Sequence, residues 1–310
     1  MLDLRRMMLL CDLADLGSVT AVAERRGITS SAVSQQLRVL EDEADATLFR
    51  REGRTLGLTR SGHVLVEHVR RVLTAVDEAV SAVAESRDHV SGHVVVSAFN
   101  MAVSTLVAPM VQRLSTSDPA LRFQVRQEIS ADGLRLLRQG EIDVAITCRY
   151  DFVGQETSTG VAGEALLLEP LVLLAPPHEH LRVRTHGLAA LADGPWISGP
   201  QNSGLGDAVM RAGEKAGFTP QVKHRLVGAR NICDLAATEV GSAIVPRLSV
   251  PQSLAGLIVP DLDLGGRTLS AVVREGRQRD PNIALILHTL RAVAAETLQS
   301  MTAGDLSVAS

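Results

Sequence analysis

The chain of 310 residues is poor in aromatic side chains: one Trp, one Tyr and five Phe make up 2% of it. Its core must therefore be built mainly from Val, Leu, Ala and Ile, and the length suggests two or three domains. Cysteine is also scarce, since only Cys11, Cys148 and Cys233 occur, widely spaced and without a CxxC pair. This spacing excludes a disulfide framework and is typical of a protein kept in a reducing compartment.

Long apolar runs are missing as well. Arg5 and Arg6 precede a short apolar stretch, but acidic residues follow Cys11 at once, and no run of about 18 apolar residues occurs elsewhere. We therefore expect a cytoplasmic protein with no membrane partner.

The usual signatures of catalysis and metal binding are absent from the sequence too. His178 and His180 stand two apart without further ligands, no GxGxxG opens a βαβ unit, and no Ser/His/Asp arrangement can be identified. We expect no enzyme, no metal and no cofactor.

What the sequence does contain is a helix with an unusual polar face. The segment Arg25–Glu41 reads RRGITSSAVSQQLRVLE, and Val33, Leu37 and Leu40 give it one buried stripe. A shorter helix, capped by Ser18 and ended by Gly27, precedes it, and Thr29 can cap the second helix. Two helices joined by a tight turn that contains glycine form the helix-turn-helix layout.

In that layout the second helix enters the DNA major groove, and its outer residues meet base edges and phosphates. Short hydroxyls and amides allow a close approach, and glutamine can pair with adenine through two hydrogen bonds. The net charge of −4 does not exclude this, because residues 25–40 carry three arginines and no acid. The outer residues are Thr29, Ser30, Ser31, Ser34, Gln35 and Arg38.

The next segment, LFRREGRTLGLTRSG, adds a basic hairpin. Leu56 and Leu58 alternate with polar residues or glycine, as in a short strand, and Gly53 is available for the turn. We expect this hairpin to be a wing beside the recognition helix, with Arg50, Arg51 and Arg54 facing the DNA backbone.

Residues 2–62 resemble the winged helix-turn-helix of the LysR-type bacterial transcriptional regulators. The family's segments correspond here to SVTAVA, TSSAVSQQLRVLE, LFRR and LTRSG, while Asp45 stands where the family commonly has glycine. The resemblance implies a DNA-binding transcriptional regulator controlled by a small-molecule effector. The alternative is a small-molecule binding module or an enzyme on a binding-protein fold, with the N-terminal region used for assembly.

After the wing, apolar residues recur at alternating intervals of four and three: Leu65, Val69, Val72, Val76, Ala79 and Val83. This is a heptad seam, and a single helix of this length would leave the seam in water. We expect a homodimer, or a homotetramer built from dimers, to bury it. The alternative is that the seam packs on the chain's own body.

From residue 91 strand-like and helical segments alternate, which indicates parallel βαβ units. The fold class is therefore α/β overall: an N-terminal all-α winged helix-turn-helix, a long linker helix and a C-terminal α/β domain, which the resemblance implies has two lobes. The resemblance implies that this domain folds like the periplasmic binding proteins, with a ligand cleft between its lobes. The expected ranges are 1–60, 61–90 and 91–300, with lobe 1 at about 91–163 and 268–300, lobe 2 at about 164–267, and a tail at 301–310.

Ligands of such sheets bind at the carboxyl ends of strands, often at helix N-termini. Hydroxyls, amides and two guanidinium groups at those places suit a small anionic or polar effector. The expected effector-binding residues are Asn100, Ser104, Thr105, Ser130, Thr147, Arg149, Asn202, Ser203 and Arg230.

Overall fold

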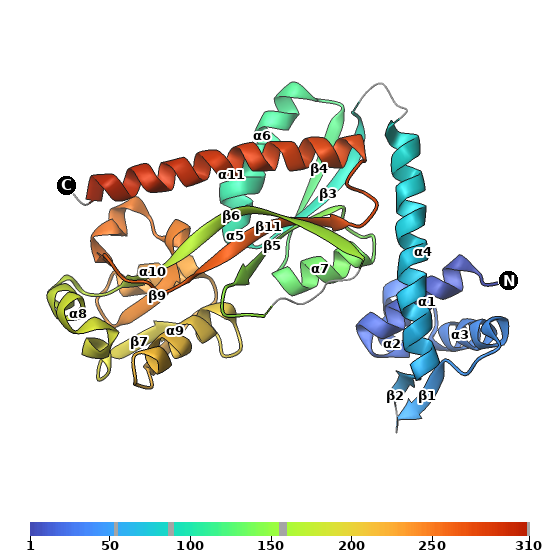
Figure 1. Cartoon of the computed structure of the whole chain (residues 1–310), viewed down its shortest axis with the longest axis horizontal. Helices are drawn as coiled ribbons and strands as arrows, with labels where there is room; N and C mark the ends of the chain where they lie inside the picture. Colours follow the sequence, from blue (N-terminus) through green and yellow to red (C-terminus); the bar gives the residue numbers. More distant parts are fainter. Residues whose placement is uncertain (53–54, 86–89, 155–159, 309–310) are drawn as a thin grey trace.

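The computed structural model describes residues 1–52, 55–85, 90–154 and 160–308. A small N-terminal body and a larger C-terminal body lie side by side, and the long helix α4 (Arg60–Glu85) rises from the first beside the second (Figure 1).

The N-terminal body consists of three helices and a hairpin. The predicted caps form: Ser18 accepts a hydrogen bond from the Ala21 amide, and Thr29 accepts one from the Ala32 amide. The third helix ends at Asp45, whose φ of 47° is left-handed, a conformation that a short polar side chain tolerates where glycine is absent. The elements are α1 (Leu4–Leu16), α2 (Val19–Arg26), α3 (Ser30–Ala44), β1 (Phe49–Glu52) and β2 (Thr55–Leu58).

One apolar cluster holds this body together. Val33, Leu37 and Leu40 of α3 are buried in it, which confirms the predicted stripe, and α1 and α2 supply most of the other residues. Helix α4 joins the same cluster through Val66 and Val69. The N-terminal body and the start of α4 therefore share one apolar core.

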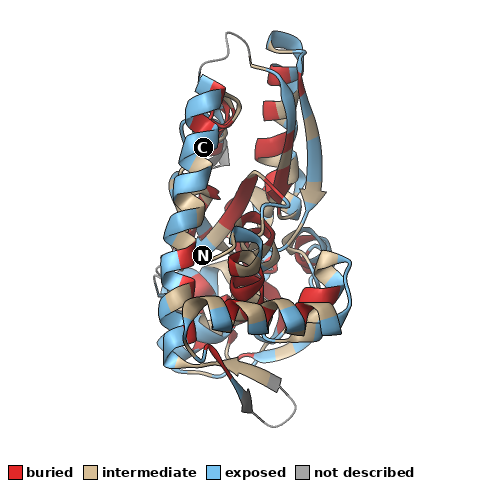
Figure 2. Ribbon diagram, turned by 90° about the vertical axis from the view of Figure 1, so that its right-hand side faces the viewer, coloured by how far each residue is buried: buried red, intermediate tan, exposed pale blue. Residues whose placement is uncertain are grey.

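The predicted seam of α4 divides into two parts. Val69 is buried and Leu65 is half-buried in the chain's own N-terminal core, so the dimer prediction is wrong for these two. Further along, Val72 and Val76 are 42% and 41% exposed, and Ala79 and Val83 are exposed as well. Figure 2 shows the outer surface of α4 largely in pale blue, the colour of exposed residues.

A continuous mixed sheet forms the C-terminal body, and it has nine strands within the described residues. Two groups of parallel strands, β4-β3-β5 and β9-β7-β8, are joined by the antiparallel strands β11 and β6 between them. The parallel groups confirm the predicted βαβ units. The strands are β3 (Gly92–Ala98), β4 (Leu121–Gln127), β5 (Val144–Tyr150), β6 (Val161–Leu174), β7 (Pro195–Ser198), β8 (Gln221–Arg225), β9 (Ser242–Pro246), β10 (Ile258–Val259, paired with β6) and β11 (Gly266–Arg274).

Strands β11 and β6 join two lobes, because β11 pairs with β5 of one parallel group and β6 pairs with β9 of the other. Each lobe has its own apolar core: one contains Val96 and Leu269, another contains Trp196 and Leu173. The helical segments are α5 (Asn100–Ala102), the π-type turns η1 (Val103–Val107), α6 (Ala108–Ser117), α7 (Ser130–Arg138), η2 (Pro177–Glu179), α8 (His180–His186), η3 (Gly187–Leu191), α9 (Gly204–Lys215), α10 (Ala229–Ala236), η4 (Arg247–Ser249), η5 (Gln252–Leu257) and α11 (Pro281–Val308).

Helix α11 crosses the face of the sheet from one lobe toward the other (Figure 1). The sequence analysis expects a tail at 301–310, yet the helix continues through residues 301–308. Only Met301, Ala303 and Leu306 in this stretch are strong helix formers, so local propensity does not predict this extension. Within the described residues, no helix has the length and apolarity that a membrane span requires.

Candidate DNA-binding and effector-binding sites

The outward face of α3 carries the side chains that the sequence analysis selects for DNA contact. Thr29, Ser30, Ser31, Gln35 and Arg38 are exposed, and Ser34 is half-buried. The Thr29 and Ser31 hydroxyls lie 2.9 Å apart, so the first turn already forms a small hydrogen-bonded group. The helix N-terminus below it carries partial positive charge, which favours a phosphate.

The two glutamines of α3 have different surroundings. Gln36 accepts a hydrogen bond from Arg6 Nη1 at 3.1 Å, and the same guanidinium pairs with Glu43 at 2.6 Å. The hydrogen bond from Arg6 lowers the pKa of the Glu43 carboxyl. Gln35 makes no side-chain hydrogen bond to the described part of the chain. Its amide therefore remains available for an external partner.

The hairpin lies next to α3, as the sequence predicts. Glu41 of α3 fixes its start by accepting hydrogen bonds from the amides of Leu48 and Phe49, at 2.7 and 3.0 Å. Arg50 on β1 is exposed, and Arg51 follows it in the same strand. Arg54, the third predicted wing residue, falls outside the described residues.

Part of the positive charge counted in this region is offset. Asp12 of α1 pairs with both Arg25 and Arg26 of α2, each at 2.6 Å, and its own side chain is 5% exposed. These two arginines therefore belong to the framework, and Arg38 and the wing supply the positive charge near the polar face.

In lobe 1, the predicted effector residues lie at the carboxyl ends of β3 and β5 and at the start of α7. Ser130 Oγ accepts a hydrogen bond from the Cys148 amide at 3.1 Å, which brings α7 and β5 together. Ser104 and Thr105 are already engaged, since both hydroxyls donate to the Met101 carbonyl at 2.9 Å. Asn100 is exposed, while Thr147 is buried in β5.

The two predicted guanidinium groups differ in charge environment. Arg230 on α10 pairs with Asp234 at 3.0 Å. Arg149 at the end of β5 is exposed and donates to the Val153 carbonyl, with no carboxylate partner among the described residues. Arg149 therefore carries the less compensated charge.

In lobe 2, Asn202 and Ser203 precede α9. Ser203 caps this helix by accepting from the Gly206 amide at 3.1 Å, and it donates to the Pro200 carbonyl. The start of α9 lies against Tyr150, because a Cβ added to Gly204 would overlap the Tyr150 ring. This contact brings the start of α9 next to the end of β5.

One cluster at the junction of the lobes was not selected from the sequence. Arg267 of β11 pairs with Glu169 of β6 at 2.7 Å, and the rings of Phe99 and Tyr150 lie 5.2 and 6.0 Å from its guanidinium carbon. Burial raises the pKa of Tyr150 to about 12, and it also raises the pKa of Glu169, against the effect of Arg267. The two residues stand opposite each other in the register of β6 and β11, both largely apolar strands, so the pairing follows from strand register and not from a motif.

No group of three or more His, Cys, Asp or Glu side chains suited to a metal ion occurs in the described residues. The three cysteines are free thiols.

Comparison with known proteins covers both bodies. Residues 4–63 match the model of the bacterial regulatory helix-turn-helix protein, lysR family, and residues 87–295 match the LysR substrate binding domain. The chain is 25% identical to the transcriptional dual regulator GltC of Bacillus subtilis, over 81% of this chain and 83% of GltC.

Solved structures agree on the fold. A full-length OxyR variant from Pseudomonas aeruginosa superimposes with a TM-score of 0.62 at 19% identity, covering 94% of this chain and 95% of that one. ArgP from Mycobacterium tuberculosis gives 0.61 at 23% identity, covering 95% and 98%.

The N-terminal match removes the alternative in which the first 90 residues serve only for assembly. This chain belongs to the LysR family of transcriptional regulators, with a DNA-binding helix-turn-helix and an effector-binding domain.

Proposed function

We propose that the protein recognises its operator through the outer face of α3 and neutralises the flanking phosphates through the wing. Gln35 and Ser34 read bases or adjacent phosphates, and Arg50, Arg51 and Arg54 contact the backbone. The observation that carries this assignment is the exposed Gln35 amide, which makes no bond within the described chain and lies among exposed hydroxyls. The protein acts as a regulator without enzymatic activity.

The exposed half of the α4 seam supports a homodimer. At about 100° per residue, Val72 and Ser81 point in opposite directions. Ser81 is buried against the chain's own C-terminal body, whereas Val72 and Val76 face away from it. A second copy of α4 would cover them, and homotetramers would form from such dimers.

The predicted division into a DNA-binding domain, a linker helix and a two-lobed effector domain is retained as part of the proposal.

The effector binds where the lobes meet, at the end of β5 and the start of α9. The contact between Tyr150 and Gly204 supports this place, because it joins residues of both lobes. Arg149 suits a carboxylate there, since its charge has no carboxylate partner among the described residues. The effector is therefore a small organic anion.

A gel-shift assay with duplexes selected from a random library tests DNA recognition. Affinity for the selected duplex should fall steeply as salt rises, because phosphate contacts release counterions. The assignment would be contradicted if the protein selected no sequence, or if its affinity for DNA did not change with salt concentration.

The effector site is tested by calorimetry with a panel of small mono- and dicarboxylates. An acid that binds the wild type should bind Arg149→Gln at least tenfold more weakly, and Arg230→Gln, whose charge Asp234 offsets, should bind it normally. Equal affinity in all three proteins would show that the effector binds elsewhere.

A further inference from the structure

A second set of contacts joins the DNA-binding domain to the effector domain, away from both proposed sites. Arg25 of α2 pairs with Glu141 at 3.2 Å and donates to the Gln139 carbonyl at 3.3 Å. The same guanidinium is held from its own side by Asp12, and the Arg25 side chain is 11% exposed. Arg126 approaches the other oxygen of Glu141 at 3.6 Å.

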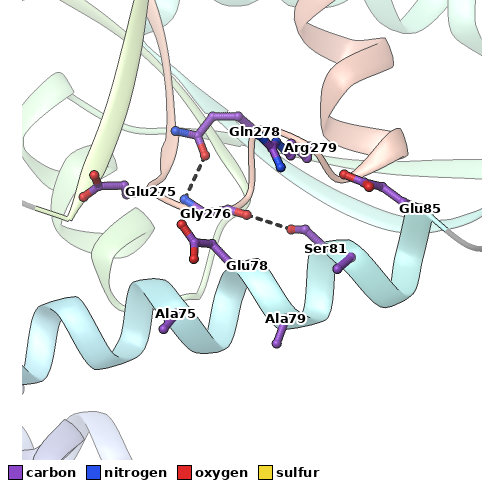
Figure 3. Close-up of a pocket in the computed structure, with 10 residues that line it drawn as sticks. Ala75, Glu78, Ala79, Ser81, Glu85, Glu275, Gly276, Gln278 and Arg279 are labelled. Atoms are coloured by element: carbon purple, nitrogen blue, oxygen red, sulfur yellow. Dashed lines mark hydrogen bonds between the residues drawn. The ribbon is translucent and has the colours of Figure 1, made fainter.

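Helix α4 makes the neighbouring contacts. Arg274 of β11 pairs with Asp77 of α4 at 2.8 Å, and its Nη1 also donates to the carbonyls of Leu137 and Ile142, at 3.4 and 3.3 Å. Ser81 of α4 donates to the Gly276 carbonyl at 2.9 Å (Figure 3). A Cβ on Gly276 would lie 2.6 Å from the Thr74 carbonyl, and its φ is +89°, so glycine is needed for this close approach.

The contacts of Arg25 and Arg274 converge on residues 137–142, which are the end of α7 and the turn before β5. Leu137, Gln139, Glu141 and Ile142 supply the groups that Arg25 and Arg274 bind. At its other end α7 begins with Ser130, which is bonded to the Cys148 amide in the proposed effector site. Because α7 has nine residues, it is about 13 Å long, and a displacement of one of its ends moves the other end as well.

The contact between the two bodies is polar, unlike the interior of either. The apolar cluster of the DNA-binding domain contains residues from the first 73 only, and the apolar clusters of the other body contain residues from 90 onward. Separating the bodies therefore exposes ion pairs and carbonyls, which water can solvate, and not a shared core. Such a contact can form and break without unfolding either side.

We propose that residues 137–142 form a regulatory docking contact that ties the unit of DNA-binding domain and α4 to the effector domain, and that α7 links this contact to effector binding. The link to α7 rests on the proposed effector site, but the docking contact does not. The recognition helix remains exposed in the docked arrangement, so docking sets the orientation of this unit and does not block DNA.

Amide hydrogen exchange on the full chain tests the docking contact. Glu141→Gln with Asp77→Asn removes one carboxylate charge from each side of the contact while keeping the side-chain shapes. The matched control, Asp132→Asn with Glu67→Gln, removes the same two charges from α7 and α4 at positions that do not touch the other body. We expect the amide exchange rates of residues 137–142 to rise about tenfold in the variant that carries Glu141→Gln and Asp77→Asn. In the control they should stay unchanged.

Adding the selected duplex DNA tests the link without a known effector, because coupling between two sites is reciprocal. In the wild type and the control, DNA should change the exchange of 130–142 at least threefold. In the docking variant the same DNA, bound as shown by gel shift, should leave 130–142 unchanged.

The possible results separate the two parts of the proposal. Unchanged exchange in the docking variant, or a DNA effect on α7 that persists in it, would overturn the docking contact, as would a control that behaves like the variant. A DNA effect that reaches 137–142 but stops before Ser130 would uphold the contact and contradict the placement of the effector beside Ser130.

Discussion

At the scale of single residues, side chains of one type have different roles according to what they already bond. Gln36 is held by Arg6, and Gln35 next to it is exposed. Arg230 is neutralised by Asp234, while Arg149 binds only a carbonyl among the described residues. The sequence identifies the candidate residue types, but these partners come from other helices or strands and cannot be predicted from local spacing.

The difference between the glutamines leads to a prediction for DNA recognition. Gln35→Ala should cost about 1–3 kcal/mol of binding free energy on the best duplex and relax the sequence preference there, because it removes a base contact. Gln36→Ala should leave the preference unchanged and lower the thermal stability instead. Competition binding with single-base variants of the duplex measures affinity and preference, and a thermal scan measures the stability of Gln36→Ala. An unchanged preference in Gln35→Ala would show that the register assigned to α3 is wrong.

The thiols provide a second prediction at this scale. Burial raises the pKa of Cys11 and of Cys233 to about 12, so at pH 8 roughly one in ten thousand of these thiols is ionised. Cys148 is half-buried at the lobe junction. We expect one thiol to react with a disulfide reagent in the native protein and all three in denaturant. Cys148→Ser should abolish the native reaction, and rapid labelling of Cys11 would contradict its burial.

At the scale of elements, the local signals in the sequence are accurate. The alternation of strands and helices expected from residue 91 onward is present, beginning with β3 and β4, and the caps Ser18 and Thr29 are in place. What could not be predicted is where each face of a helix packs. A heptad pattern does not distinguish the chain's own core from that of a second copy, so Val69 and Val72 look alike in sequence.

The exposed part of α4 predicts the effect of a charge in the seam. Val76→Glu should weaken self-association at least a hundredfold, because a carboxylate would be buried between two helices. Ala82→Glu adds the same charge outside the seam and should leave the dimer intact. Sedimentation velocity measures both, and an unaltered Val76→Glu dimer would assign assembly to another surface.

The ion pair between Arg6 of α1 and Glu43 of α3 should make the free energy of unfolding depend on pH. Glu43 has a lower pKa in the folded protein, through its hydrogen bond from Arg6. Its contribution is therefore present above the pKa of the unfolded chain and is lost as pH falls through the folded pKa. We expect Glu43→Gln to unfold at a lower temperature than wild type at pH 7, with a difference that shrinks on acidification. Thermal scans between pH 7 and pH 3 measure this, with Glu67→Gln as a control, and a difference independent of pH would rule out the charge as its source.

At the scale of the whole molecule, the sequence predicts two bodies and the linker between them but not how they meet. The order of helix-turn-helix, wing, long helix and alternating strands is visible locally, and the family matches cover both bodies. The pairing of Arg25 with Glu141 joins residues 116 positions apart, and Arg274 with Asp77 joins residues 197 apart. Nothing in either neighbourhood distinguishes these charges from ordinary surface charges, so only the folded chain reveals the contact.

The separation of the apolar cores has a consequence for recombination. Residues 1–85 share no apolar cluster with the remainder, so this segment could be exchanged between regulators as a cassette without repacking either part. A chimera that carries it on a foreign effector domain would fold and bind the same duplexes. It would nevertheless lose its response, since a foreign effector domain would lack the partners of Arg25 in the turn 137–142 and the β11 partner of Asp77, Arg274. Such a gene fusion would therefore keep the DNA sequence that the regulator binds and change its response to the effector.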